Sequence, residues 1–135
     1  MIWVKYELVV AVQEWQRTLH GGLSGLADPG ALEAALARPA QLYAYEQAGV
    51  WELAACYAEA IVQAHAFNDA NKRTAFVVTA TFLEINGYRL DASQLEIVQT
   101  MLAVANHEIT RTELAQWLQR NSCPMQIPSS TLSRG

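Results

Sequence analysis

The sequence predicts an all-α fold, a single-domain bundle of about six helices around one central buried helix. First, the chain has 135 residues and 52% of them are hydrophobic, which is enough for one core. Second, apolar residues recur at helical spacing in several segments, and no segment has a convincing strand pattern. Third, glycine, proline and capping residues separate these segments, as expected at helix ends.

The first two helices are expected at residues 5–19 and from Pro29 to about residue 38. The first carries one apolar stripe at helical spacing, made of Leu8, Val12, Trp15 and Leu19. His20-Gly21-Gly22 ends this helix, because paired glycines favour left-handed conformations. Asp28 caps the second helix, and Pro39 is expected to stop it.

The stretch from Ala40 to Val50 is the least regular, and a loop, a short hairpin and a ragged helix all remain open for it. Helices follow at residues 51–64 and 71–86, and the second of these is apolar on most of its circumference. Such a helix is usually buried, so it is expected to occupy the centre.

Two capping residues predict the last two helices. Ser93 and Thr110 each precede an acid by three residues, Glu96 and Glu113, as in a capping box. The folded domain is therefore expected at residues 1–122, with a disordered tail at residues 123–135.

Composition restricts the function classes. The chain has 13 acidic and 9 basic residues and no basic stripe, which disfavours a direct nucleic-acid partner. No apolar run is long enough for a membrane span, and the start lacks the pattern of a signal peptide. The two cysteines lack metal-ligand spacing, and Cys56 is expected in the core. These features predict a cytoplasmic protein without a membrane partner.

The run His65-Ala66-Phe67-Asn68-Asp69-Ala70-Asn71-Lys72-Arg73 concentrates polar chemistry at the junction of two predicted helices. Phe67 is apolar within this polar run, so its side chain is expected to enter the core. Asn71 begins the fourth helix, whose first N–H groups favour an anion. Lys72 and Arg73 add two positive charges suited to phosphate.

The same run offers a metal ligand and a base. Asp69 is its only carboxylate, and Mg²⁺ prefers carboxylate and phosphate oxygens. His65 is able to accept a proton near neutral pH. An ordinary polar turn remains open as well, with His65 as a helix cap, Asn68-Asp69 as turn residues and the two cations on a solvated face.

These nine residues, H-A-F-N-D-A-N-K-R, resemble the signature of the Fic/Doc family, H-x-F-x-[D/E]-G-N-G-R. Alanine and lysine at the two glycine places match the Doc-type form. The similarity extends upstream, in Gly21-Gly22, Leu26-Ala27-Asp28-Pro29-Gly30 and Leu36-Ala37-Arg38-Pro39, and downstream in Thr74-Ala75 and Asn86-Gly87. It covers roughly residues 5–120.

The resemblance implies the all-helical fold of this family and the toxin of a toxin–antitoxin pair. Doc-type toxins are kinases that move the γ-phosphate of ATP to a threonine of elongation factor Tu. By this resemblance His65 is the base and Asp69 the Mg²⁺ ligand. Asn71, Lys72 and Arg73 bind the nucleotide phosphates, and Asn68 is a further polar contact.

In the family, the residue at the position of Lys72 distinguishes the two reactions. Most members transfer AMP, and a glycine at this position lets the phosphates lie against the helix end. A lysine there goes with phosphoryl transfer. The resemblance therefore favours a kinase, with a Fic-type AMP transferase and a catalytically silent antitoxin-binding module as alternatives.

The family also suggests partners. The chain has no match to the family's internal inhibitory motif [S/T]-x-x-x-E-[G/N], so regulation is expected from a separate Phd-like antitoxin. The stretch Ala40 to Val50 matches the position of the family's target-docking flap. Tyr43 and Tyr45 are candidate contacts there, or ordinary core or surface tyrosines.

Overall fold

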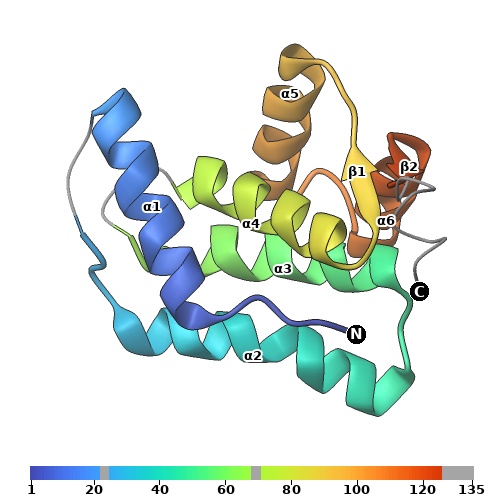
Figure 1. The fold of residues 1–135 in the computed structure, drawn as a ribbon, viewed down its shortest axis with the longest axis horizontal. Helices are drawn as coiled ribbons and strands as arrows, with labels where there is room; N and C mark the ends of the chain where they lie inside the picture. The colour runs from blue at the N-terminus through green and yellow to red at the C-terminus, as the bar shows by residue number, and fades with distance from the viewer. Residues whose placement is uncertain (22–24, 68–70, 126–135) are drawn as a thin grey trace, which may run out of the picture.

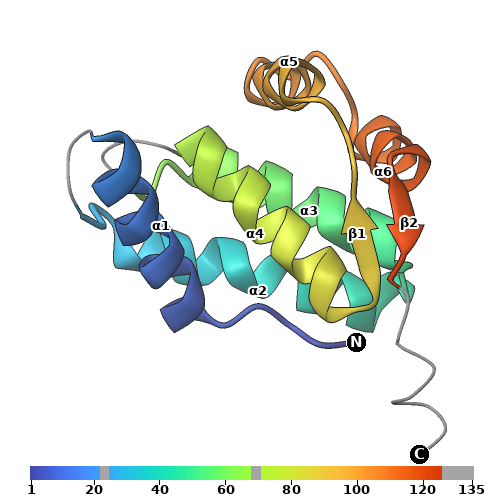
Figure 2. The same cartoon turned by 45° about the horizontal axis from the view of Figure 1, so that its top comes forward.

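Helices α3 and α4 form the centre of the structure, with α5 and α6 on one side of the pair and α2 on the other (Figures 1 and 2). A computed structural model describes residues 1–21, 25–67 and 71–125. These residues form α1 (Tyr6–His20), α2 (Pro29–Glu46), α3 (Val50–Ala64), α4 (Asn71–Ile85), β1 (Tyr88–Leu90), α5 (Gln94–Ala105), α6 (Arg111–Arg120) and β2 (Ser122–Pro124). The predicted all-α class is confirmed, and one small sheet is added to it. None of the helices in the described ranges has the length and hydropathy to cross a bilayer.

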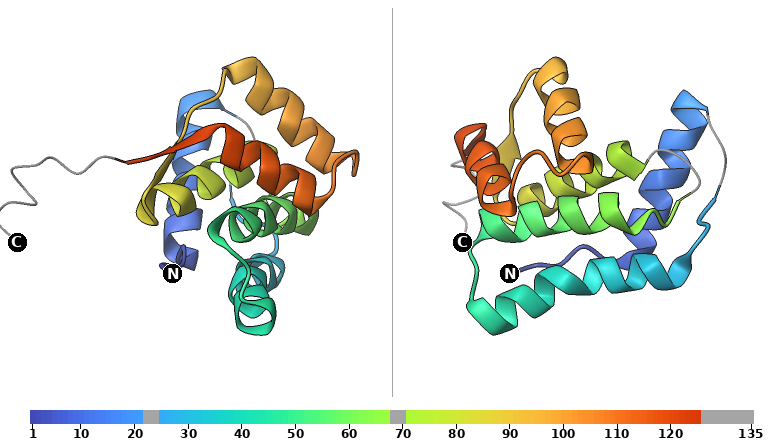
Figure 3. Two further views of the ribbon diagram at one scale, coloured as in Figure 1. Left: turned by 90° about the vertical axis from the view of Figure 1, so that its right-hand side faces the viewer. Right: turned by 180° about the vertical axis from the view of Figure 1, so that it is seen from behind.

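The most enclosed helix is α3, which packs against α2, α4 and α6 (Figure 3). Nine of its residues are buried, against six in α4, so α3 shares the central position expected of α4 alone. Its many alanines allow neighbouring helices to approach closely. The rings of Tyr57 and Phe82 join the two helices, with centroids 4.9 Å apart and both side chains fully buried. Burial of each such side chain contributes roughly 1.5–3 kcal/mol.

Helix α2 continues through Pro39 to Glu46, so the helix end expected near Arg38 is wrong. An interior proline removes one hydrogen bond and crowds the preceding turn, at a cost of about 3 kcal/mol. Pro39 is buried, and the packing of α2 along α3 offsets that cost. The expected irregular stretch is therefore helical over residues 40–46, and Gln47 ends it in the left-handed region at φ 53°.

The apolar stripe predicted on α1 exists, but most of it faces solvent. Three of its four members are 41%, 59% and 56% exposed, namely Leu8, Trp15 and Leu19. The face that α1 buries carries Val9, Gln13 and Gln16. A periodic pattern identifies a helix without showing which of its faces the neighbours cover, and here α4 and α2 cover a face with two glutamines.

Strand β1 pairs antiparallel with β2, with Arg89 opposite Cys123. Three-residue strands are too short for a detectable alternation, which is why the sequence did not predict them. The Ser122 hydroxyl donates to the Leu118 carbonyl at 2.7 Å, which ties β2 to α6. Paired backbone thus extends to Pro124, beyond the boundary expected at residue 122, and residues 126–135 of the expected tail lie outside the described ranges.

The predicted caps of the last two helices are confirmed. The Ser93 hydroxyl accepts from the Glu96 N–H at 3.2 Å, and the Thr110 hydroxyl accepts from the Glu113 N–H at 3.1 Å. The Glu113 carboxylate also accepts from the Thr110 N–H at 2.9 Å, which completes a capping box. Such a cap contributes about 1 kcal/mol, and it fixes where α6 begins.

The two cysteines differ in their surroundings. Cys56 is buried in α3, as expected for a core residue, whereas Cys123 is exposed on β2. Burial raises the pKa of the Cys56 thiol above its ordinary value. This thiol is therefore protonated at neutral pH and behaves as a small apolar core residue.

Candidate active site

The backbone before α4 is fixed to the segment before α2. The N–H groups of Ala27 and Asp28 donate to the Ala66 carbonyl at 2.8 and 2.9 Å. Leu26 and Phe67 form an isolated antiparallel bridge. Phe67 is only 3% exposed, which confirms the expectation that this side chain enters the core. The first residues of the motif thus have a defined position relative to both helices.

Asn71 connects the start of α4 to the same segment. Its Oδ1 accepts from the Phe67 N–H at 3.2 Å, and its Nδ2 donates to the Phe67 carbonyl at 2.9 Å. Between these two anchor points lie Asn68 and Asp69, which fall outside the described residues. The expectations for both therefore remain predictions.

His65 ends α3 in the left-handed conformation, at φ 50° and ψ 39°. A non-glycine residue in this backbone region destabilises the folded state by about 1–3 kcal/mol. Such residues are concentrated at functional sites. The His65 side chain is exposed, and it is absent from the described residues that line the neighbouring cavity. The structure thus confirms that His65 ends the helix, whereas its role as a base remains a prediction.

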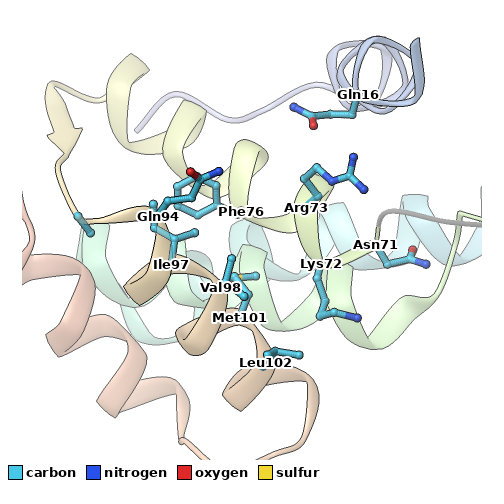
Figure 4. Close-up of a pocket in the computed structure, with 11 residues that line it drawn as sticks. Gln16, Asn71, Lys72, Arg73, Phe76, Gln94, Ile97, Val98, Met101 and Leu102 are labelled. Atoms are coloured by element: carbon cyan, nitrogen blue, oxygen red, sulfur yellow. The ribbon is translucent and has the colours of Figure 1, made fainter. Parts of the chain in front are cut away.

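A cavity of about 770 Å³ lies at the first turn of α4 (Figure 4). This volume falls within the usual range of small-molecule sites. Its described lining comes from α1, α4 and α5 and the residues just before α5, namely Gln16, Asn71, Lys72, Arg73, Phe76, Ala92, Gln94, Ile97, Val98, Met101 and Leu102. Three of the predicted site residues, Asn71, Lys72 and Arg73, thus share one cavity.

One end of this cavity is strongly cationic. Lys72 and Arg73 occupy the first turn of α4, which contains no acidic residue. The amino end of a helix already carries partial positive charge, so each added cation there costs roughly 0.3–1 kcal/mol. A bound anion removes this repulsion and also satisfies free N–H groups of the first turn. In a chain of net charge −4, this local arrangement favours an anionic ligand.

The opposite wall is apolar. It is formed by Phe76 of α4 and by four residues of α5: Ile97, Val98, Met101 and Leu102 (Figure 4). Val98 and Leu102 are 50% and 44% exposed, so part of this apolar wall is accessible to a ligand. The cavity therefore suits a molecule with an anionic end and a body that tolerates apolar contact.

Four buried polar atoms have no hydrogen-bond partner within the described residues. They are Gln13 Nε2, Gln16 Oε1, Arg73 Nη1 and Thr74 Oγ1. All four belong to α1 or to the first turn of α4, two helices that pack together. Buried polar groups are normally paired, so their concentration here requires an explanation.

Gln16 lines the cavity but was not predicted from the sequence as a site residue. A signal was present, because Val9, Gln13 and Gln16 are spaced by four and three residues and therefore share one helix face. The apolar stripe of α1 predicted that the face carrying it would be buried, and these glutamines do not lie on that face. The apolar wall from α5 was likewise not predicted as part of the site.

The model of the Fic/DOC family matches residues 3–83, a span that begins before α1 and includes most of α4. It therefore contains the His65–Arg73 run and the whole cationic end of the cavity.

Two characterised proteins are similar to the chain. One is "Protein kinase doc" of Escherichia phage P1, which is 36% identical over 115 residues, or 84% of this chain and 90% of that protein. The other is "Toxin Doc" of Mycolicibacterium smegmatis, which is 43% identical over 76 residues, or 53% of this chain and 57% of that protein. The first similarity extends over nearly the full length of the relative.

Proposed function

Because the chain belongs to the Fic/DOC family, we propose that it is the toxin of a toxin–antitoxin pair and acts as a protein kinase. In this proposal it transfers the γ-phosphate of ATP to a threonine hydroxyl of elongation factor Tu and so blocks translation. The observation that carries the proposal is Lys72 at the cationic end of the cavity, in a chain 36% identical to a relative named as a protein kinase.

Two parts of the cavity lining support ATP as the proposed ligand. Lys72 and Arg73 are placed to bind phosphate oxygens, the lysine as a point charge and the arginine through paired N–H groups. Asn71 and the first N–H groups of α4 add neutral donors. The apolar wall formed by Phe76 and α5 suits the adenosine end.

Mg²⁺ is the proposed metal, with Asp69 as its protein ligand, because Mg²⁺ prefers carboxylate and phosphate oxygens. When bound, Mg²⁺ neutralises charge on the phosphates. Asp69 lies two residues before Asn71 and two after Phe67, the pair whose hydrogen bonds hold the ends of this segment together. Its carboxylate therefore belongs to the same short segment as the phosphate-binding cations. Asn68 is proposed as a further polar contact.

His65 is proposed as the base for the acceptor hydroxyl. The threonine oxygen forms a bond to the γ-phosphorus while the bond from that phosphorus to the bridging oxygen of ADP breaks. The hydroxyl proton passes to the imidazole of His65. His65 is exposed, and an exposed position suits an acceptor presented by a large protein substrate.

The proposed partners are an antitoxin and the target protein. A Phd-like antitoxin in the same cytoplasm is proposed to restrain the enzyme. The carboxyl end of α2 is proposed to contact the target, since Tyr45 is 91% exposed there. Tyr43 is less suited to this contact, because its ring packs at 5.7 Å from Trp3.

Incubation with elongation factor Tu and ATP labelled on either the γ- or the α-phosphate tests this proposal. We expect label to reach the target from the γ-phosphate only. His65→Ala should abolish the transfer without loss of fold, and Gln63→Ala, an exposed change on the same helix, should retain it. Label from the α-phosphate alone would identify an AMP transferase, and no label from folded protein would favour a silent antitoxin-binding module.

A further inference from the structure

Helix α1 and the first turn of α4, which belong to two helices that pack together, carry four residues with buried polar atoms: Gln13, Gln16, Arg73 and Thr74, which we call the polar seam. Each of these residues has a buried polar atom without a partner within the described part of the chain. The remaining described side chains contain no further such atom. The lack of partners is thus confined to two packed helices beside the cavity.

Packing alone does not account for this seam. Gln13 and Gln16 are 1% and 6% exposed, while Trp15 and Leu19 on the same helix are 59% and 56% exposed. Burial of side-chain amides together with exposure of apolar side chains on one helix is the reverse of what the hydrophobic effect alone favours. Departures of this kind from local rules are typical of functional sites.

Within the seam, only Gln16 and Arg73 also line the cavity. Arg73 extends from α4 toward α1, where Gln16 lies (Figure 4). The unpartnered atoms of the two residues are complementary, because Gln16 Oε1 accepts hydrogen bonds and Arg73 Nη1 donates them. Gln13 is buried on the same helix as Gln16 but does not belong to the described cavity lining.

We propose that Gln16 is a positioning residue for Arg73. With a triphosphate in the cavity, the Gln16 amide oxygen accepts a hydrogen bond from Arg73 Nη1 and fixes the plane of the guanidinium. The other guanidinium N–H groups then point at phosphate oxygens in a bidentate arrangement. This inference rests on the proposed nucleotide site and adds to it a residue outside the nine-residue motif.

Calorimetric titration of ATP, in the absence of any protein substrate, tests the role of Gln16. Gln16→Met keeps the length and volume of the side chain but removes the acceptor, and we expect it to raise the Kd for ATP about tenfold. Gln13→Met is the matched control, since it replaces a buried glutamine of the same helix face outside the cavity. It should leave the Kd unchanged, and both variants should melt at or above the wild-type temperature.

A second titration asks whether Gln16 acts through Arg73. Arg73→Ala should weaken ATP binding by itself, and adding Gln16→Met to it should change the Kd less than twofold. A structural role alone would instead lower the melting temperature and leave the Kd of the Arg73-containing protein unaltered. Full tenfold weakening in the Arg73→Ala background would also overturn the proposal, because Gln16 would then act independently of Arg73.

Failure of this inference can be separated from failure of the proposed function. If wild-type protein binds ATP and Gln16→Met binds it equally well, the positioning role is wrong and the nucleotide site stands. If folded wild-type protein does not bind ATP, both proposals fall together. If Gln16→Met and the shorter Gln16→Ala both fail to fold, Gln16 is structural and the positioning role is wrong.

Discussion

The side chain of Asn71 forms two hydrogen bonds to the backbone of one residue, Phe67. Oδ1 accepts from the Phe67 N–H at 3.2 Å, and Nδ2 donates to the Phe67 carbonyl at 2.9 Å. Phe67 is itself held in the core and bridged to Leu26. One amide therefore connects the start of α4 to a fixed part of the core, and the Asp69 segment lies between the two residues in the chain.

Asn71→Ala tests the connection between Phe67 and the start of α4. Loss of two hydrogen bonds at about 1 kcal/mol each predicts a fall of roughly 1–3 kcal/mol in the free energy of unfolding, measured in urea. Because the ends of the motif segment are no longer joined, we expect kcat/KM for phosphoryl transfer to fall at least about 100-fold. Unchanged activity in a destabilised Asn71→Ala protein would show that the connection has no role in catalysis.

Two substitutions at Lys72 should distinguish its charge from its bulk. Lys72→Met keeps a long side chain without charge, so we expect weaker ATP binding with γ-phosphate transfer still the reaction. Lys72→Gly also frees space at the helix end, and we expect α-phosphate transfer to appear beside a reduced γ-phosphate transfer. The assay is the doubly labelled ATP experiment. Equal reactions in Lys72→Gly and Lys72→Met would contradict the proposed role of side-chain volume.

The Thr110 capping box should contribute to stability without affecting the site. Thr110→Ala removes the acceptor for the Glu113 N–H, so a loss of about 1 kcal/mol in unfolding free energy is expected. Thr112→Ala changes an exposed threonine of the same helix and should have little effect. ATP affinity should be the same in both variants, and a change in affinity would indicate that α6 influences the cavity.

The raised pKa of Tyr57 should make the folded protein less stable at alkaline pH. Burial raises the pKa of its hydroxyl, and the hydrogen bond received from the Val4 N–H opposes that rise in part. The folded state therefore favours the protonated form. This contribution is complete below the unfolded-state pKa of about 10 and is lost as pH rises through the folded-state pKa.

Tyr57→Phe tests this assignment. At neutral pH it should lower the free energy of unfolding by about 1–2 kcal/mol, since the Val4 N–H loses its acceptor. Between roughly pH 9.5 and 11, unfolding in urea should depend less on pH than in the wild type. Cys56, whose pKa burial also raises, is present in both proteins and cancels in the comparison. Equal slopes in the two proteins would remove Tyr57 as the cause.

Local chemistry accounts for what the sequence predicted well. Ser93, Thr110 and the glutamates three residues later form caps by contacts within four residues, so the pattern alone locates both helix starts. The end of α3 at His65 and the burial of Phe67 were predicted for similar reasons. The cationic end of the cavity also comes from adjacent residues, Lys72 and Arg73.

Long-range packing accounts for what the sequence did not predict. Pro39 lies inside α2 because contacts with α3 offset a local penalty that the sequence alone cannot weigh. The orientation of α1 depends on α2 and α4, so its exposed Trp15 and buried Gln16 could not be assigned from periodicity. The apolar wall from α5 is formed only when distant segments meet. The cavity beside the motif is formed by such long-range contacts, because α1 and α5 supply part of its lining.

A mass spectrum of elongation factor Tu after incubation with the wild-type protein and ATP–Mg²⁺ tests the central claim most directly. Peptide fragmentation identifies both the added group and the residue that carries it. The proposal predicts one phosphoryl group on a threonine, absent when His65→Ala replaces the wild type. An AMP group in its place, or phosphate added equally by His65→Ala, would contradict it.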